Sequence, residues 1–258
     1  MNPHSSPGRW VRRFHDATPD RPVVVCFPHA GGSASFFQPF SAHCRPHAEV
    51  LAIQYPGRQD RFADPPLTSI TALAEAVVAE LGDWLHRPLV LFGHSMGATV
   101  AFEVARRLAV PALGTPRALV ASSRIAPSRR QTRTPRLDER GILDELRRLR
   151  GGPVTIDDDV LELALPALRS DFAAVAAYRC PPQRKVHCPV TVFVGAEDNS
   201  VTAEDSGAWA RHTSGRFELR TFPGGHHYLE DQWAPVAAAV LEVTGLTPSE
   251  PMSRRARP

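Results

Sequence analysis

The stretch from Leu91 to Ala109 reads LFGHSMGATVAFEVARRLA and contains the pattern that decides the fold. An apolar run breaks at Gly93, Ser95 stands between two glycines, and an amphipathic helical pattern begins directly afterwards. This segment fits the motif G-x-S-x-G, which between a strand and a helix holds a serine hydroxyl exposed in a sharp turn. The alternative is that Ser95 is only a small residue filling a tight turn. An acid and a histidine elsewhere in the chain would favour the first interpretation.

Short apolar runs alternate with helical patterns along most of the chain. Near-continuous apolar strands separated by helices predict a mostly parallel sheet that is covered by helices on both faces. The runs predict strands at 22–27, 50–55, 89–94, 118–123, 190–195 and 217–222, and the helical patterns lie at 35–43, 69–86, 96–109, 202–213 and 230–243.

The length of 258 residues fits a single α/β domain, which we expect over 21–245. An N-terminal tail is expected over 1–20, and the composition of 246–258 is typical of a disordered tail. A Pro- and Arg-rich connector interrupts the alternation and is followed by two or three helical pieces, at 138–149, 156–170 and 171–178. We therefore expect a lid insertion at about 125–188. The alternative for this insertion is a small extra domain or a surface decoration.

The composition excludes several classes of protein. No apolar run approaches the length of a membrane span, and a net charge of +3 without a basic, aromatic stripe argues against nucleic-acid binding. The N-terminus lacks the apolar core of a secretory signal, so we expect a cytoplasmic protein. Its four cysteines show no metal-ligand spacing and fit reduced thiols. Between residues 124 and 150, however, nine arginines stand against four acidic residues.

Two later strand ends supply the partners that a serine nucleophile needs. A serine hydroxyl attacks efficiently only when a histidine takes its proton and an acid orients that histidine. Asp198 follows the strand predicted at 190–195, and His226 follows the strand predicted at 217–222. The order serine, acid, histidine is that of the α/β-hydrolase fold, which we therefore predict, with a helical lid.

Each partner has a neighbour that could take its place. Glu197 stands beside Asp198, and we favour Asp198 because it is the third residue after the strand's final glycine. An acid could also follow the earlier strand, but that position reads Ser122-Ser123. His227 stands beside His226, and we favour His226 because it follows two glycines directly.

The oxyanion formed during acyl transfer needs two backbone N–H donors, normally from the residue after the nucleophile and from a loop after an early strand. Met96 is the first candidate, and Ala30 in the loop FPHAGGSASFF is the second. His29 in the same loop is expected to line the pocket, and His94 is expected to pack beside the serine.

Six segments follow one another in order from about 20 to 245: FPHAGGSASFF, QYPGRQDR, GHSMGA, LRSDFAAVAAY, GAEDNSV and FPGGHHYL. Several of them lie outside the general hydrolase consensus, and together they resemble the type II thioesterases that accompany polyketide synthases and nonribosomal peptide synthetases. The resemblance implies Ser95 as nucleophile, His226 as base, Asp198 as orienting acid, and Ala30 and Met96 as the oxyanion hole. One departure is His227, where relatives often have an aromatic residue.

The resemblance further implies an editing enzyme that hydrolyses aberrant or stalled acyl groups from the phosphopantetheine arm of acyl or peptidyl carrier proteins in antibiotic biosynthesis. It implies no metal or redox cofactor. We expect a free-standing monomer, and arginines of the lid that steer acidic carrier proteins to the entrance. The alternatives are a carboxylesterase or acyltransferase with the same three residues, or a non-catalytic partner protein on a hydrolase fold.

Overall fold

A seven-stranded sheet forms the centre of the molecule, which we describe from a computed structural model for residues 9–18, 21–109, 114–130, 135–153, 156–243 and 245. The strand order is β1-β3-β2-β4-β5-β6-β7, and every neighbouring pair is parallel except β1 with β3. The predicted mostly parallel sheet of the α/β-hydrolase fold is thus confirmed. Its strands are β1 Val11–Arg12, β2 Val23–Phe27, β3 Glu49–Ile53, β4 Leu89–His94, β5 Ala118–Ser122, β6 Val190–Gly195 and β7 Phe217–Phe222.

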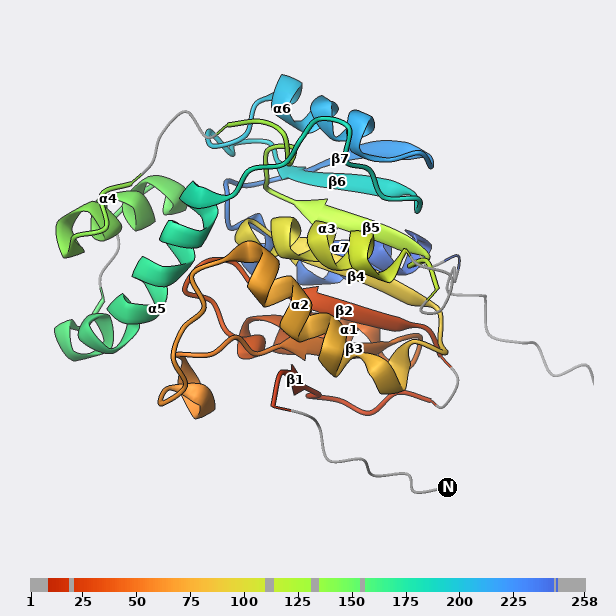
Figure 1. Cartoon of the computed structure of the whole chain (residues 1–258), viewed down its shortest axis with the longest axis horizontal. Coiled ribbons are helices and arrows are strands. Elements are labelled where there is room, and N and C mark those ends of the chain that lie inside the picture. Colours follow the sequence, from red (N-terminus) through yellow and green to blue (C-terminus); the bar gives the residue numbers. More distant parts are fainter. Residues whose placement is uncertain are drawn as a thin grey trace, which may run out of the picture.

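Helices cover both faces of this sheet because successive strand residues point to opposite sides. In β2, Val23 and Val25 pack with α2 (Ile70–Glu80) and α3 (Met96–Leu108). Val24 points the other way, to the face that α1 (Gln38–Cys44) and α7 (Trp233–Val243) cover. Figure 1 shows these two layers on either side of the strands.

Two further helices lie beyond the carboxyl ends of the strands, at the left of Figure 1. They are α4 (Glu139–Arg150) and α5 (Asp158–Ala177), between β5 and β6, and we call them the lid helices. Asp138 caps α4 by accepting a hydrogen bond from the Gly141 N–H at 3.0 Å. The pieces predicted separately at 156–170 and 171–178 form one helix, α5, which continues through Pro166.

The remaining helix α6 (Ala203–Gly207) follows β6 and begins with a capping box of Thr202 and Asp205. A 3₁₀ segment continues it through residues 208–212, so the helix predicted at 202–213 is present in two parts. Within the described ranges, no helix is long and apolar enough to cross a bilayer.

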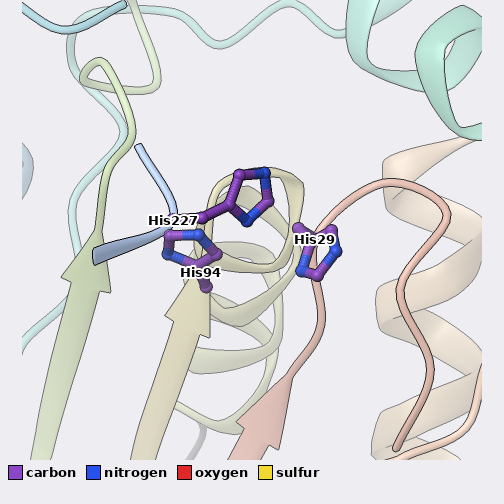
Figure 2. A group of neighbouring side chains, drawn as sticks. All are labelled: His29, His94 and His227. Carbon is purple, nitrogen blue, oxygen red and sulfur yellow. The ribbon is translucent and has the colours of Figure 1, made fainter. Parts of the chain in front are cut away.

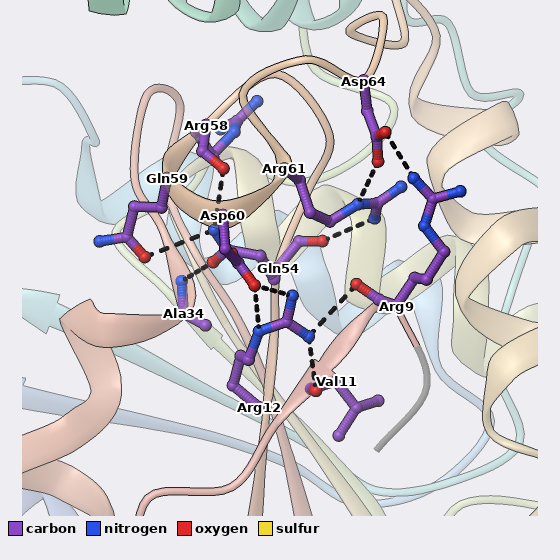
Figure 3. A network of polar contacts seen from close by, with 10 residues as sticks. All are labelled: Arg9, Val11, Arg12, Ala34, Gln54, Arg58, Gln59, Asp60, Arg61 and Asp64. Atoms are coloured by element: carbon purple, nitrogen blue, oxygen red, sulfur yellow. Dashed lines mark hydrogen bonds and ion pairs between the residues drawn. The ribbon is translucent and has the colours of Figure 1, made fainter. Parts of the chain in front are cut away.

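The sheet begins earlier in the chain than the sequence predicted. Val11 and Arg12, which lie in the range 1–20 expected to be a tail, form β1 and pair antiparallel with β3. The Val11 side chain is fully buried, and the Arg12 guanidinium binds the Asp60 carboxylate in the loop after β3 (Figure 3). A two-residue strand carries too little periodicity to be recognised from sequence. The tail predicted at 246–258 lies outside the described residues.

Candidate active site

Ser95 occupies the sharp turn between β4 and α3. Its backbone has φ 53° and ψ −119°, a left-handed conformation that is strained for a residue with a side chain. The turn is closed on both sides: a Cβ on Gly97 would lie 1.9 Å from the Phe27 carbonyl oxygen, and one on Gly93 would lie 2.3 Å from the Gly97 carbonyl oxygen. Only glycine fits at either position, which is the physical reason for the G-x-S-x-G spacing.

A chain of hydrogen bonds runs from Ser95 through His226 to Asp198. His226 Nε2 lies 3.0 Å from Ser95 Oγ, and His226 Nδ1 lies 3.0 Å from Asp198 Oδ2. With the Nδ1–H donating to the carboxylate, Nε2 is left to accept the serine proton. The three residues come from loops after β4, β6 and β7, so the parallel sheet delivers all of them to the same edge.

The environment of Asp198 keeps it ionised. Burial opposes ionisation, but hydrogen bonds from His226 and Ser200 outweigh it and lower the pKa of Asp198 to about 2. The Ser200 hydroxyl donates to Asp198 Oδ1 at 2.5 Å, and its backbone N–H donates to the same oxygen at 2.9 Å. Glu197 is exposed, and among the described residues no hydrogen bond or ion pair joins its carboxylate to His226, so of the two acids considered the structure places only Asp198 in the chain.

The other histidines of this region lie beside the chain of hydrogen bonds without joining it. The His227 ring packs edge-on against the rings of His29 and His94 (Figure 2). His94 is fully buried, as expected for a packing residue, and its Nδ1 lies 2.9 Å from Ser122 Oγ. His29 was expected to line the pocket, but its ring packs edge-on against Phe36 instead.

Ala30 and Met96, the predicted oxyanion donors, both line the cavity that contains Ser95 and His226. The loop that carries Ala30 is held from the lid, because the next amide, Gly31 N–H, donates to Asp171 Oδ2 at 2.8 Å. Asp171 lies on α5 and is 1% exposed. Arg58 also binds it through two nitrogens, at 2.7 and 3.0 Å, and donates to the Gly32 carbonyl at 3.0 Å.

Other residues of the segment QYPGRQDR, which contains Arg58, also hold this loop (Figure 3). Gln54 is fully buried; its Oε1 accepts a hydrogen bond from the Ala34 N–H at 2.7 Å, and its Nε2 donates to the Arg58 carbonyl at 3.1 Å. Arg61 then donates to the Gln54 carbonyl at 2.9 Å. This motif therefore fixes the backbone beside the nucleophile.

The cavity around Ser95 has a volume of about 230 Å³, and the lid helices form part of its wall through Arg148, Leu149, Phe172 and Val175. A second cavity of about 580 Å³ adjoins it and is lined by Arg129, Arg179, Tyr178 and Cys180 among others. Arg124, Ile125, Arg130 and Val175 line both cavities. The arginine-rich cavity and the cavity at the serine therefore share part of their wall.

Sequence reasoning did not assign roles to Ser200, Arg58, Asp171 or Gln54. Each of them lies inside a quoted motif: Ser200 in GAEDNSV, Gln54 and Arg58 in QYPGRQDR, and Asp171 in LRSDFAAVAAY. The motifs marked these positions, but the pairing of Arg58 with Asp171 joins residues 113 positions apart and becomes visible only in the fold.

The chain is similar to known thioesterases along most of its length. The thioesterase domain model matches residues 22–243. Thioesterase PikA5 of Streptomyces venezuelae is 45% identical over 97% of this chain and 91% of its own length. The probable cadicidin biosynthesis thioesterase of Streptomyces griseus is 47% identical over 86% of this chain and 62% of its own length.

Among solved structures, the type II thioesterase BorB from the borrelidin biosynthetic cluster superposes with a TM-score of 0.84. Its sequence is 41% identical, and the match covers 94% of this chain and 100% of that chain. On sequence, fold and site geometry together, this chain belongs to the thioesterase family and, within it, to the type II thioesterases of polyketide and nonribosomal peptide biosynthesis.

Proposed function

We propose that this thioesterase releases stalled or aberrant acyl groups from the phosphopantetheine arm of acyl or peptidyl carrier proteins. The observation that carries the proposal is the hydrogen-bonded chain of Ser95, His226 and Asp198 at a cavity walled by the lid helices, in a member of this family. Three relatives are named for cadicidin biosynthesis, gramicidin S biosynthesis and the borrelidin biosynthetic cluster, which supports an editing role for this chain in a pathway of that kind.

In the proposed mechanism Ser95 is the nucleophile and His226 the base. Ser95 Oγ attacks the thioester carbonyl carbon while His226 Nε2 takes its proton, and the N–H groups of Ala30 and Met96 stabilise the oxyanion. The carbon–sulfur bond then breaks, and the pantetheine thiol leaves with the proton from His226. A water activated by the same histidine hydrolyses the acyl-serine ester and restores Ser95.

The size of the cavity supports a short acyl group. Pockets for drug-sized ligands have volumes of about 300 to 1,000 Å³, whereas the cavity at Ser95 has about 230 Å³. We therefore propose short chains, such as those left by premature decarboxylation of an extender unit, in preference to a full-length product.

The charges of the lid refine the proposed steering of carrier proteins. Arg148, Arg150 and Arg129 pair with Glu145, Glu230 and Glu204, so much of the positive charge predicted from sequence is neutralised locally. In the part of the chain that the structure describes, Arg130 and Arg179 have no carboxylate partner, and both line the larger cavity. We propose that this cavity receives the pantetheine arm and that these two arginines face its phosphate.

The state of the cysteines supports the proposed cytoplasmic location. All four are free, and Cys26, Cys44 and Cys188 are buried. Burial raises the pKa of these three thiols, which keeps them protonated and unreactive at neutral pH. Reduced thiols are typical of a cytoplasmic compartment.

A panel of acyl-carrier proteins tests the function, with mass spectrometry following loss of each acyl group. We expect acetyl and propionyl groups to be released faster than octanoyl, and the thioester faster than a matched oxygen ester. The folded Ser95→Ala variant is expected to be inactive on all of them. Faster cleavage of the oxygen ester would instead support a carboxylesterase, and carrier thioesters cleaved by Ser95→Ala would contradict the proposed mechanism.

A further inference from the structure

Three histidines from distant parts of the sequence gather beside the catalytic chain. His29 follows β2, His94 ends β4, and His227 lies in the turn after β7 (Figure 2). Their ring centroids are 5.0 to 5.8 Å apart, and one nitrogen from each ring lies within 4.8 Å of the other two. The proposed mechanism uses none of these three rings.

Each ring has a buried nitrogen without a hydrogen-bond partner among the described residues: His29 Nδ1, His94 Nε2 and His227 Nδ1. A buried polar atom left unpaired typically costs about 1–3 kcal/mol, so three of them together point to a missing common partner. His94 is completely buried, and its other nitrogen, Nδ1, lies 2.9 Å from Ser122 Oγ. When Nδ1–H donates to Ser122, Nε2 carries a free lone pair.

The protonation state of the cluster suits a metal ion. Burial lowers the pKa of all three rings, that of His227 to about 4, with the neighbouring histidines and Arg150 contributing to the shift at His29 and His227. Neutral imidazole is the form that binds a metal. A bond from the other ring nitrogen to a fixed group, as from His94 to Ser122, is the usual way in which proteins orient such a ligand.

We propose that His29, His94 and His227 bind a divalent transition-metal ion of the Zn²⁺ type. Three imidazoles suit zinc, copper and nickel, and a zinc–nitrogen bond of about 2.0–2.1 Å places the nitrogens roughly 3.3 Å apart. The ring nitrogens, now within 4.8 Å of one another, therefore have to approach to roughly 3.3 Å when the ion binds. Glu230, whose Oε1 lies 3.7 Å from His227 Nδ1, offers a negative charge or a fourth ligand at the edge of the site.

His227 is half-buried, so it can be replaced with less disturbance of the core than His94, which is completely buried. His227→Phe is therefore the informative variant: it removes one ligand and keeps a flat ring against His29. The matched control is His187→Phe, which removes an exposed histidine outside the cluster.

The test uses chelator-treated full-length protein, with Zn²⁺ binding measured by calorimetry and Co²⁺ binding by its visible absorption. We expect one ion per chain, unchanged binding in His187→Phe, and binding about 100-fold weaker or lost in His227→Phe, since losing even an outer partner of a metal ligand costs 10–100-fold. Equal binding by wild type and His227→Phe would overturn the proposal, as would wild-type protein that binds no ion.

Two further measurements keep this test decisive. His29→Gln removes a second ligand from a different loop, so it replaces His227→Phe if that variant fails to fold, with the same loss expected. Ser95→Ala should bind the ion as wild type does. Binding that disappears in Ser95→Ala but persists in His227→Phe would place the ion at the catalytic serine and refute the three-histidine site.

Discussion

Asp171 joins the lid to the loop that carries the proposed oxyanion donor Ala30, and its replacement by Asn tests that connection. The carboxylate accepts hydrogen bonds from Gly31 N–H and from two nitrogens of Arg58. Asn has only one oxygen, so its amide NH₂ must face one of these donors, and the Arg58 charge loses its counter-ion in a buried site.

The expected magnitude follows from these contacts. Breaking a buried ion pair by removing one partner typically costs about 3–5 kcal/mol, and we expect the lower part of this range because Asn keeps one acceptor. Loss of a complete oxyanion donor lowers kcat by about 10²–10³. Because Ala30 is displaced and not removed, we expect kcat to fall about 10- to 100-fold while KM changes less than threefold.

The assay combines urea unfolding with hydrolysis of a small acyl thioester. Asp144→Asn is the control, since Asp144 is also on a lid helix but its side chain is 49% exposed and pairs with Arg147 at the surface. We expect this control to change the free energy of unfolding by less than about 0.5 kcal/mol. The double variant Arg58→Met/Asp171→Leu should regain stability without regaining kcat. A folded Asp171→Asn enzyme with wild-type kcat would refute the positioning role.

Three further variants test other parts of the site. Asp198 has a pKa held at about 2, below its ordinary value near 4, so its carboxylate stabilises the fold above pH 4 and loses this effect as the pH falls toward 2. In urea unfolding, the free energy of unfolding of wild type should exceed that of Asp198→Asn by about 2 kcal/mol at pH 7 and by about 1 kcal/mol at pH 3. A difference that does not change with pH would contradict this, and the control Glu197→Gln should be as stable as wild type. Gly97→Ala should destabilise by about 3 kcal/mol or more, because its Cβ would overlap the Phe27 carbonyl, whereas Gly207→Ala, with open space around it, should be neutral or slightly stabilising by thermal unfolding. Arg179→Gln should raise KM about fivefold for an acyl-carrier protein but not for a small thioester without phosphate, with the exposed Arg216→Gln as control; equal effects on both substrates would argue against a phosphate contact.

Much of the fold was readable from sequence because its signals are local. The six longer strands lie within two residues of their predicted bounds, since each is a buried apolar run that ends at a turn. The helix predicted at 69–86 begins at Ile70, where Ser69 caps it by accepting a hydrogen bond from the Ala72 N–H. The strand at Val11–Arg12 was missed because two residues carry too little periodicity, and the pieces expected at 156–170 and 171–178 proved to be one helix that continues across Ser170 and Asp171.

The sequence by itself determined that a serine, an acid and a histidine each follow a strand, and a parallel sheet brings such strand ends to one edge. Only the tertiary structure decided which of two adjacent residues joins the hydrogen-bonded chain, because neighbours in a loop point in different directions. His226 contacts both Ser95 and Asp198, whereas Glu197 is exposed and the His227 ring packs against His29. The tie between Arg58 and Asp171 was equally beyond the sequence, since no local pattern connects side chains that meet only when the lid packs on the sheet.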